Sequence, residues 1–413
     1  MKTVSCFSSR ARIAALALPA AWFAMLCEGH AQLASAQLPG GLNCPKLPPE
    51  GHVTSNPIAC TVSCAKGGKV ASALALAPRT TAGLTITING TCVEAVDQVP
   101  GNVTLQGASS GDGFQAPAAS SNPVLGISGA GVTLDNLTIS GGVNALLVRN
   151  GATAVGNNLV IEGSSSQNVL VNGVVTLNSS SIENSSGHGI DAVSGGKVFL
   201  NGGTVRNNSR GLMLGSESYL LIDAGTVVSD NAASFGAVVS GGSLAVRSGT
   251  IENNSPDGIN VNNGGIATLL GGLAVIRSNA RDGVRVFGGS ARSLGGVISN
   301  NGGEGVSVFN SGTAILDTGT VVASNAMNGV LVEDGTVNVG NGDGTAIIQS
   351  SGGNGIYLKT NSVGFFNNAG NQIVSNSGWG ILCDGPPANP LIAGTIGTVS
   401  SNGAGQISCN MAP

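Results

Sequence analysis

The chain has 413 residues, of which 66 are glycine, while 9% are charged and 3% are aromatic. So little charge excludes the usual composition of disordered chains, and the lack of a strict three-residue glycine period excludes collagen. The formal net charge is −4, and this acidic balance opposes a polyanion such as nucleic acid as the partner.

The N-terminus has the pattern of a secretory signal. Lys2, Arg10 and Arg12 form a basic region, and an apolar stretch follows over residues 13–26. Small residues suited to cleavage come next. We therefore expect residues 1–36 to be removed as a signal peptide, and the protein to be secreted to the extracellular space, the cell surface or the periplasm. No later stretch is apolar enough to span a membrane, so we expect no span in the mature chain.

Six cysteines follow the expected signal peptide. An even count in an exported chain indicates disulfides. Four of the six lie near the start and two near the end, and the four allow three connectivities. No CxxC pair is present, so we expect no metal site at these residues. The preferred pairs are Cys44–Cys60, Cys64–Cys92 and Cys383–Cys409.

Residues 37–100 form a segment rich in cysteine and proline. Within it, Val70, Leu74 and Ala77 recur at helical spacing over residues 68–78, and residues 85–88 alternate as a strand does. We expect this segment to contain a short capping helix.

From residue 132 onward the chain consists of short β-patterns between Gly, Asn and Ser turns. A glycine followed by an apolar residue, most often Ile or Val, and an alternating strand recurs every 22 to 26 residues. Each period holds three short strands, with no room for a helix. One strand has too few apolar residues to fold alone, so we expect successive coils to stack on one core. The leading glycines are Gly189, Gly211, Gly236, Gly258, Gly283, Gly305, Gly329, Gly355 and Gly380.

An asparagine precedes most of these glycines by three to five residues. Stacked coils would place these side chains in a ladder in which each amide bonds the coils above and below. This structural role accounts for the asparagines better than glycosylation or ligand binding does. The residues concerned are Asn184, Asn208, Asn231, Asn254, Asn279, Asn301, Asn325 and Asn376.

The period, the glycine-led strands and the asparagine ladder resemble the right-handed parallel β-helix of the pectin-lyase-like superfamily. The resemblance implies an all-β, single-stranded helix of about 11–12 coils over residues 101–382, with a short N-terminal capping helix. Residues 383–413 would form a C-terminal cap closed by a disulfide. A leucine-rich repeat shares the period, but the dense leucine pattern and the helical stretch of that repeat are absent.

The superfamily includes polysaccharide lyases and hydrolases, so we sought a catalytic cluster. Residues 187–189 read Gly-His-Gly, as in polygalacturonases, but the other motifs of those enzymes are absent and Gly189 is already a repeat glycine. We therefore interpret His188 as a turn residue and assign no catalytic residue.

One row of side chains is the best candidate for a ligand site. Asp257, Asp282 and Glu304 precede the repeat glycine on three successive coils, so they should stack about 4.8 Å apart. Within each glycine-led strand, alternate positions face outward, which places Arg285, Phe287 and Phe309 beside the carboxylates. These six residues could bind a sugar or an ion. We expect no cofactor, with Ca²⁺ considered only because lyases of this superfamily hold it with carboxylates.

The uniform coils favour a protein without catalytic activity, because enzymes of this fold usually carry long loops that wall a groove. We expect an exported scaffold, adhesin-like or glycan-binding rod, with a polysaccharide or cell-surface glycan as partner. The alternative is a polysaccharide lyase or hydrolase acting on uronic-acid polymers. The oligomeric state is left open.

Overall fold

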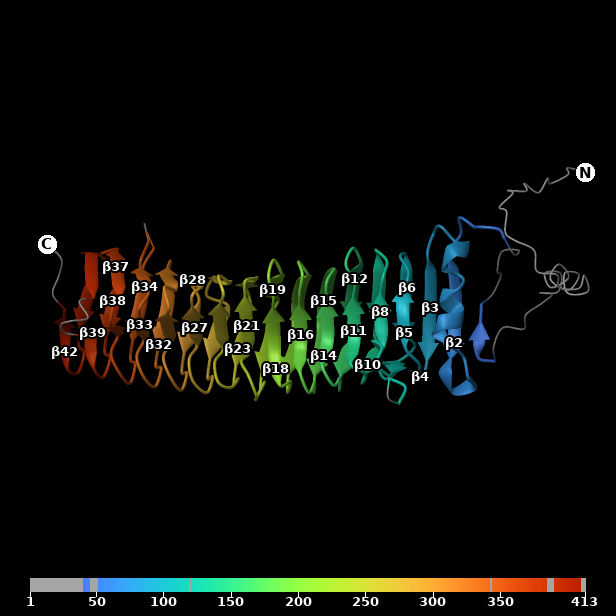
Figure 1. The fold of residues 1–413 in the computed structure, drawn as a ribbon, viewed down its shortest axis with the longest axis horizontal. Helices are drawn as coiled ribbons and strands as arrows, with labels where there is room; N and C mark the ends of the chain where they lie inside the picture. Colours follow the sequence, from blue (N-terminus) through green and yellow to red (C-terminus); the bar gives the residue numbers. More distant parts are fainter. Residues whose placement is uncertain (1–39, 45–50, 119, 342–343, 385–389, 410–413) are drawn as a thin grey trace, which may run out of the picture. The chain divides into compact units, whose positions relative to one another are not determined.

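The computed structural model describes residues 40–44, 51–118, 120–341, 344–384 and 390–409. The expected signal peptide lies outside this described part. The described residues belong to one compact unit, and within it the strands of successive coils stand side by side (Figure 1). The right-handed parallel β-helix expected from the repeats is confirmed.

One face of each coil contributes to a sheet of 14 parallel strands, which we call the glycine-led sheet. Its strands are β5 (Val96–Val99), β8 (Leu125–Ile127), β11 (Asn144–Val148), β14 (Gln167–Val171), β16 (His188–Ala192), β18 (Arg210–Leu214), β21 (Ala237–Ser240), β24 (Ile259–Asn262), β27 (Val284–Phe287), β30 (Val306–Phe309), β33 (Val330–Glu333), β36 (Ile356–Leu358), β39 (Trp379–Cys383) and β42 (Gly405–Ser408).

The other two faces join into one 28-stranded sheet, because β15 (Val174–Glu183) and β17 (Lys197–Arg206) run from one face to the next without a break. The first face also holds β2 (Ile58–Ser63), β3 (Leu84–Asn89), β6 (Val103–Gly107), β9 (Val132–Asp135), β12 (Thr153–Asn157), β19 (Tyr219–Asp223), β22 (Ser243–Val246), β25 (Ile266–Leu270), β28 (Ser290–Leu294), β31 (Thr313–Asp317), β34 (Thr336–Val339), β37 (Val363–Asn367) and β40 (Leu391–Thr395). The second face also holds β4 (Thr91–Val93), β7 (Gly113–Gln115), β10 (Thr138–Ser140), β13 (Val160–Glu162), β20 (Thr226–Ser229), β23 (Gly249–Glu252), β26 (Ala274–Arg277), β29 (Val297–Ser299), β32 (Thr320–Ala323), β35 (Ala346–Gln349), β38 (Gln372–Val374) and β41 (Thr398–Ser400).

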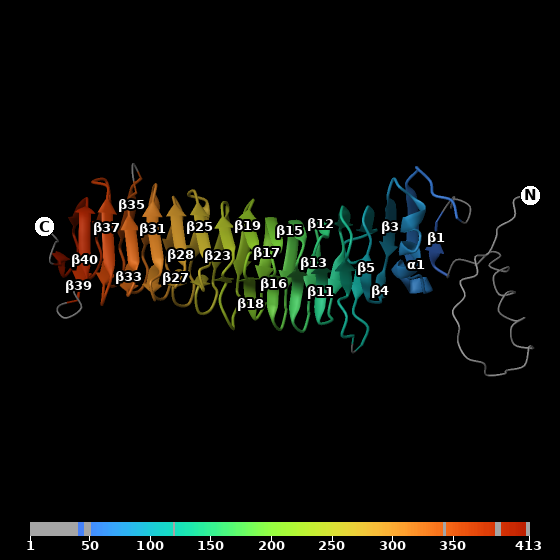
Figure 2. The ribbon, with the colours of Figure 1, turned by 45° about the horizontal axis from the view of Figure 1, so that its top comes forward.

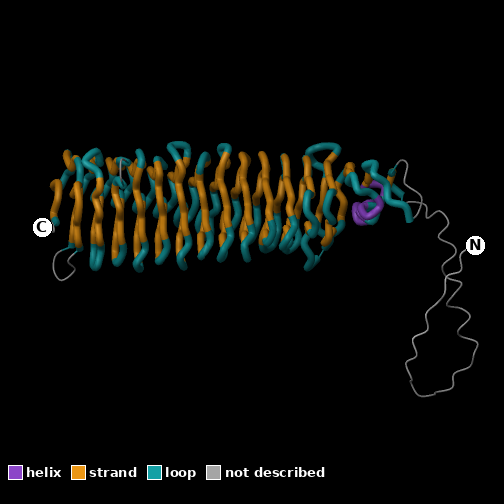
Figure 3. Tube along the Cα trace, turned by 90° about the horizontal axis from the view of Figure 1, so that it is seen from above, coloured by secondary structure: helices purple, strands orange, loops and turns teal. Residues whose placement is uncertain are grey.

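The first coil is covered by a small cap, as expected from residues 68–78. The helix α1 (Val70–Leu74) buries Val70, Ala73 and Leu74. It lies at the end of the stack of coils that is nearer the N-terminus (Figures 2 and 3). The carboxylate of Glu94 accepts a hydrogen bond from the first amide of α1, at 2.7 Å. The 3-10 turns η1 (Cys64–Lys66) and η2 (Ala77–Arg79) flank the helix, and β1 (Leu42–Asn43) pairs with β2 in antiparallel orientation.

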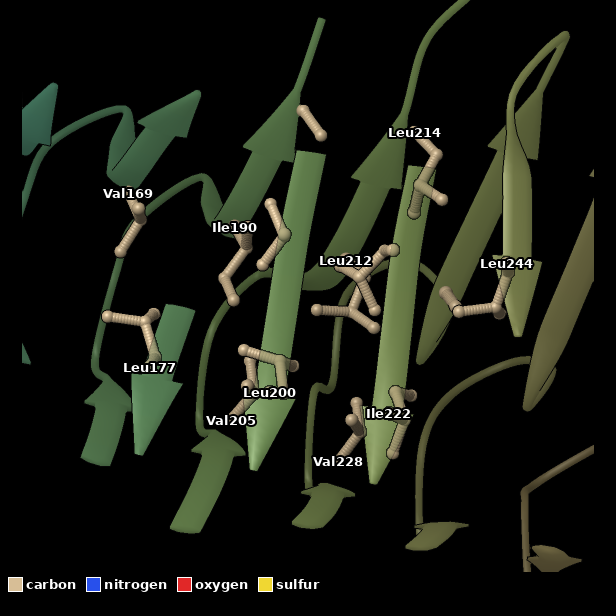
Figure 4. Close-up of a cluster of buried hydrophobic side chains, with 14 of the residues drawn as sticks. Val169, Leu177, Ile190, Leu200, Val205, Leu212, Leu214, Ile222, Val228 and Leu244 are labelled. Carbon is tan, nitrogen blue, oxygen red and sulfur yellow. The ribbon is translucent and has the colours of Figure 1, made fainter. Parts of the chain in front are cut away.

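The interior of the coils is a continuous stack of aliphatic side chains (Figure 4). Ile190 and Leu212 occupy equivalent positions on β16 and β18, and both are fully buried. Val205 and Ile222, from the other two faces, point into the same space (Figure 4). The predicted assignment of the first and third strand positions to the core is therefore correct for these coils.

Most corners before the strands led by repeat glycines combine three features: a left-handed residue, a ladder asparagine and the repeat glycine. The residue preceding the ladder asparagine is left-handed, with φ of 55° at both Asn253 and Ser278. The ladder side chain itself is buried, and Asn279 accepts hydrogen bonds from the backbone and side-chain nitrogens of Asn254 at 3.1 Å each. Asn184, however, is exposed and outside the ladder, where Ser185 takes its place.

The repeat glycine is explained by close approach. A Cβ on Gly258 would lie 2.7 Å from the side-chain nitrogen of Asn279 and 2.7 Å from the carbonyl oxygen of Gly283. The ladder asparagine of the next coil thus fills the space that any other side chain would need. The ladder asparagine and the repeat glycine of the preceding coil therefore pack against each other, and this pairing recurs from coil to coil.

Parallel stacking extends beyond the expected boundaries. It begins at β2, which pairs with β3, and continues to β42, which pairs with β39. The 14 strands of the glycine-led sheet exceed the 11 or 12 coils expected, because the coils before residue 132 have irregular turns that hide the period. The structure contains all three preferred disulfides, Cys44–Cys60, Cys64–Cys92 and Cys383–Cys409.

Candidate functional site

The outer surface of the glycine-led sheet carries Arg285, Phe287 and Phe309, as expected from the strand register. Arg285 and Phe287 lie on β27, and Phe309 is the direct neighbour of Phe287 on β30. The Arg285 guanidinium lies over the Phe309 ring, 5.2 Å from its centre, and Phe287 is 45% exposed. This cluster offers a cation and an exposed aromatic face to solvent.

The three candidate carboxylates stack on successive coils as expected, but they are buried. Asp257, Asp282 and Glu304 are 0%, 4% and 7% exposed. Asp257 accepts hydrogen bonds from Arg281 Nε at 2.8 Å and Nη2 at 2.7 Å. Asp282 accepts one from Ser307 Oγ at 2.6 Å. These carboxylates are engaged with the protein's own donors.

The same positions form a second ladder along the rod. Asp257 Oδ1 accepts the backbone N–H of Asp282 at 3.1 Å, and Asp282 Oδ1 accepts that of Glu304 at 3.2 Å. On later coils Asn328 accepts the backbone N–H of Asn354 at 2.9 Å. The row therefore satisfies turn amides between coils, which is a structural use of its acceptors.

The electrostatics of this row differ from coil to coil. Arg281 pairs with Asp257, and this hydrogen bond raises the pKa of the guanidinium. Among the described residues no cation donates a hydrogen bond to Glu304. Its burial and the neighbouring charge of Asp282 raise the pKa of its carboxyl group. Within the described residues, no group of three or more His, Cys, Asp and Glu side chains is arranged to hold a metal ion.

A second polar cluster lies on the same face, where the sequence predicted only a turn. His188 begins β16, and Arg210 is its direct neighbour on β18. His188 Nδ1 is 3.2 Å from Asp191 Oδ2, and Arg210 Nη1 is 2.8 Å from His188 Nε2. Arg210 also donates to Ser234 Oγ from Nε at 3.4 Å and from Nη2 at 3.3 Å. The sequence held a signal for this cluster, a histidine three residues before an outward aspartate and one period before an arginine.

Polar groups without partners gather on this face. In the described part of the chain, five buried side-chain nitrogen or oxygen atoms have no hydrogen-bond partner. Four of the five belong to β11, to the residue that follows it, to β16 and to β24: Asn144 Oδ1, Arg149 Nε, Asp191 Oδ1 and Asn262 Oδ1. A buried polar atom without a partner is costly, and four of these five atoms lie in or directly beside strands of the glycine-led sheet.

The arginines that lack a carboxylate partner among the described residues also lie on this face. Six other arginines pair with carboxylates: Arg149, Arg206, Arg247, Arg277, Arg281 and Arg292. Arg210 and Arg285 have no carboxylate partner among the described residues, and both lie on the glycine-led sheet. Three coil steps separate them, from β18 through β21 and β24 to β27, which corresponds to about 14 Å along the rod.

One match to a protein-family model agrees with this architecture. The model of the right-handed beta helix region matches residues 124–273, and the chain is a right-handed parallel β-helix repeat protein. Among solved structures, the chain is similar to the A-module of mannuronan C-5 epimerase AlgE6 from Azotobacter vinelandii, with 13% identity and a TM-score of 0.29 over 83% of this chain and 94% of that chain. A mutant of the periplasmic alginate epimerase AlgG gives 11% identity and a TM-score of 0.36 over 86% and 85%.

A third structure, the Agl-KA catalytic domain, gives 14% identity and a TM-score of 0.29 over 88% of this chain and 69% of that chain. No curated protein sequence matches the chain. No helix in the described residues is long and apolar enough to cross a membrane.

Proposed function

We propose that the protein is an exported rod that binds an acidic polysaccharide along the outer surface of the glycine-led sheet. The observation that carries this proposal is the pair of arginines, Arg210 and Arg285, that lack carboxylate partners on this face. They supply local positive charge to a chain whose net charge of −4 would otherwise oppose a polyanion. A guanidinium with free N–H groups binds carboxylates well, and a uronic-acid polymer presents carboxylates along its length. The three disulfides suit an oxidising, extracytoplasmic location.

The aromatic residues support a sugar as the ligand. Phe287 exposes its ring beside the cation stacked on Phe309, and a pyranose ring has an apolar face that packs on such a ring. The buried row of Asp257, Asp282 and Glu304 then supports the site from beneath and does not contact the ligand.

The binding test is retention in native gels that contain polygalacturonate, alginate or neutral dextran. We expect the acidic polymers to retain the protein, with retention weakening as salt is raised, and dextran to have little effect. Arg285→Ala should weaken binding about ten- to hundredfold, since a hydrogen bond to a charged group contributes about 1.5–3 kcal/mol. Phe287→Ala should weaken it by a similar factor.

Two variants on the 28-stranded sheet serve as matched controls. Arg277, on β26, is paired with Glu252 at 2.7 Å, and Phe365, on β37, is 38% exposed. Arg277→Ala and Phe365→Ala should leave retention unchanged. Equal retention of Arg285→Ala and the original protein, or no retention by either acidic polymer, would contradict the proposed function.

A further inference from the structure

The second face of the 28-stranded sheet has a flat outer surface that carries an uncharged row of side chains. From β10 to β35 its strands pair in parallel without a register shift. One outward residue from each strand forms the row, and each is half-buried and either small or β-branched. A flat strip of this kind is suited to packing against another flat surface. The aliphatic members of the row are Val160, Val227, Val275, Val297, Val321 and Ile347.

A charged row runs beside the uncharged one, two residues further along each strand. Its central positions on β15, β17, β20, β23 and β26 are register partners from coil to coil, and they hold Glu183, Arg206, Ser229, Glu252 and Arg277. Along the rod the charges are therefore negative, positive, zero, negative and positive. When this order is reversed about Ser229, every negative charge faces a positive one. The row is thus complementary to a second copy of itself.

The two arginines of this row have hydrogen-bond donors to spare. Arg206 Nε donates to Glu183 Oε2 at 2.7 Å, and Arg277 Nε donates to Glu252 Oε2 at 2.7 Å. No other hydrogen bond of either guanidinium is found among the described residues, and their side chains are 49% and 50% exposed. A guanidinium has five N–H donors, so each can bind a second carboxylate.

We propose that a second copy of this chain docks on this face and forms a two-fold symmetric dimer. The symmetry axis runs parallel to the strands through Ser229, so that the order of coils in one rod is opposite to that in the other. Glu183 then faces Arg277 of the partner subunit, and Arg206 faces Glu252 of the partner subunit. A two-fold interface must be complementary to itself, which is the property of the charged row. Facing sheets lie about 10 Å apart, a gap that arginine and glutamate side chains span together.

The size of the overlap suits a reversible dimer. With the axis at Ser229, the strands from β10 to β32 face those of the second copy, a length of about 40 Å along the rod. A width of about 15 Å gives each copy a footprint of about 600 Å², near the lower end of specific interfaces. At the centre, Val227 packs on its own copy. Leu273, which directly precedes β26 and is 71% exposed, would be covered at the edge.

Two acidic residues lie outside the complementary pattern. Glu162 would face the neutral Ser299 of the partner subunit. Asp230 follows Ser229 at the corner of the coil, where it is exposed, and it would lie near its own copy at the rim of the interface. Charges at a rim are screened by solvent and salt. Neither residue therefore prevents docking.

The dimer is independent of the proposed glycan binding. The glycine-led sheet is a different face of the coil, so it stays open in both copies. Arg277→Ala alters the dimer interface, and its retention in polysaccharide gels is therefore compared with its own mobility in gels without polymer. Loss of the dimer with glycan binding intact would refute only the dimer, and the reverse result would refute only the proposed function.

The test is sedimentation velocity of the purified protein from about 1 to 100 µM, a range in which an interface of this size should associate. We expect a monomer–dimer equilibrium. The double variant Glu183→Arg with Arg206→Glu keeps an ion pair within the rod but brings like charges together across the interface. Its dimer dissociation constant should rise at least ~100-fold. The matched control exchanges an ion pair on the glycine-led sheet, Glu333→Lys with Lys359→Glu, and should dimerise as the original does.

Restoring the pattern should restore the dimer. Exchange of the other pair, Glu252→Arg with Arg277→Glu, should also give monomers. A protein that carries both exchanges has a complementary row again and should dimerise, and an equimolar mixture of the two single-exchange variants should form heterodimers. Circular dichroism of each variant verifies that the β-helix has formed. An original protein that stays monomeric at 100 µM, single-exchange variants that dimerise as the original does, or a mixture that stays monomeric would each overturn the proposed dimer.

Discussion

At the scale of single residues, three carboxylates at equivalent positions have different roles because their neighbours differ. Asp257 is paired with Arg281 at 2.7 Å, whereas Glu304 accepts a hydrogen bond from the neutral amide of Asn328 at 3.2 Å. The stacked positions are the same, yet one carboxylate is hydrogen-bonded to a cation and the other to a neutral amide. The ionisation of Glu304 should therefore make the stability of the folded protein depend on pH, and a substitution of Glu304 should change that dependence.

We expect Glu304→Gln to stabilise the protein at neutral pH. The raised pKa of Glu304 means that the folded protein binds this proton more tightly than the unfolded chain does. Its contribution to stability is then fully present below the unfolded pKa and is lost as pH rises through the folded pKa. Glutamine keeps the acceptor for Asn328 without the charge. The melting temperature of Glu304→Gln should exceed that of the original protein at about pH 8 and match it near pH 4.

Asp257→Asn provides the contrast, because it leaves Arg281 without its partner. This variant should melt at a lower temperature than the original protein at about pH 8. If Glu304→Gln also melted at a lower temperature at that pH, the conclusion that ionised Glu304 destabilises the folded protein would be wrong.

At the scale of the coil, the corner before each glycine-led strand is the element on which stacking depends. The asparagine ladder, the left-handed residue before it and the glycine after it are needed together. Asn279 Nδ2 donates to the carbonyl oxygen of Ile251 at 3.2 Å and to Asn301 Oδ1 at 3.0 Å. A single side chain thus satisfies buried groups on both neighbouring coils.

Asn279→Ala should destabilise the protein by about 3 kcal/mol, because it leaves several buried backbone and amide groups without partners. The measurement is the free energy of unfolding from urea denaturation. Asn338 is the control: it is half-buried on β34 and no hydrogen bond of its side chain is found among the described residues. Asn338→Ala should change stability by about 0.5 kcal/mol or less. A similar effect of both substitutions would show that the ladder contributes little.

The sequence predicted this element better than it predicted the candidate site. Period and alternation identify Ile190 as core and Arg285 as outward, since both follow from strand geometry alone. Spacing also placed Asp257, Asp282 and Glu304 in one row. The sequence could not reveal that these carboxylates accept hydrogen bonds from backbone amides of the next coil, or that the Arg210 side chain contacts His188. Both contacts depend on side-chain conformations that strand spacing does not determine.

At the scale of the whole molecule, the stacked coils form a one-dimensional array in which each coil contacts mainly its two neighbours. The two ends of the described array differ. At the N-terminal end, α1 and β1 cover the first coil and two disulfides link the cap to it. At the other end, the described strands finish with β40, β41 and β42, and Cys383–Cys409 links β39 to the residue after β42.

The coils at the C-terminal end of the described array should open independently of distant coils. The disulfide closes a chain loop of 26 residues, for which loop closure contributes about 3 kcal/mol. In an array with nearest-neighbour coupling, this contribution stabilises the last coils against local opening and leaves distant coils unaffected. Replacing both cysteines by serine should therefore speed amide hydrogen exchange in β39 and β42 on the order of 100-fold, while exchange in β16 and β18 stays the same. Uniform acceleration along the rod would instead mean that the coils open as one cooperative unit, and then substitutions at the C-terminal end would also disturb the surface that carries His188 and Arg285.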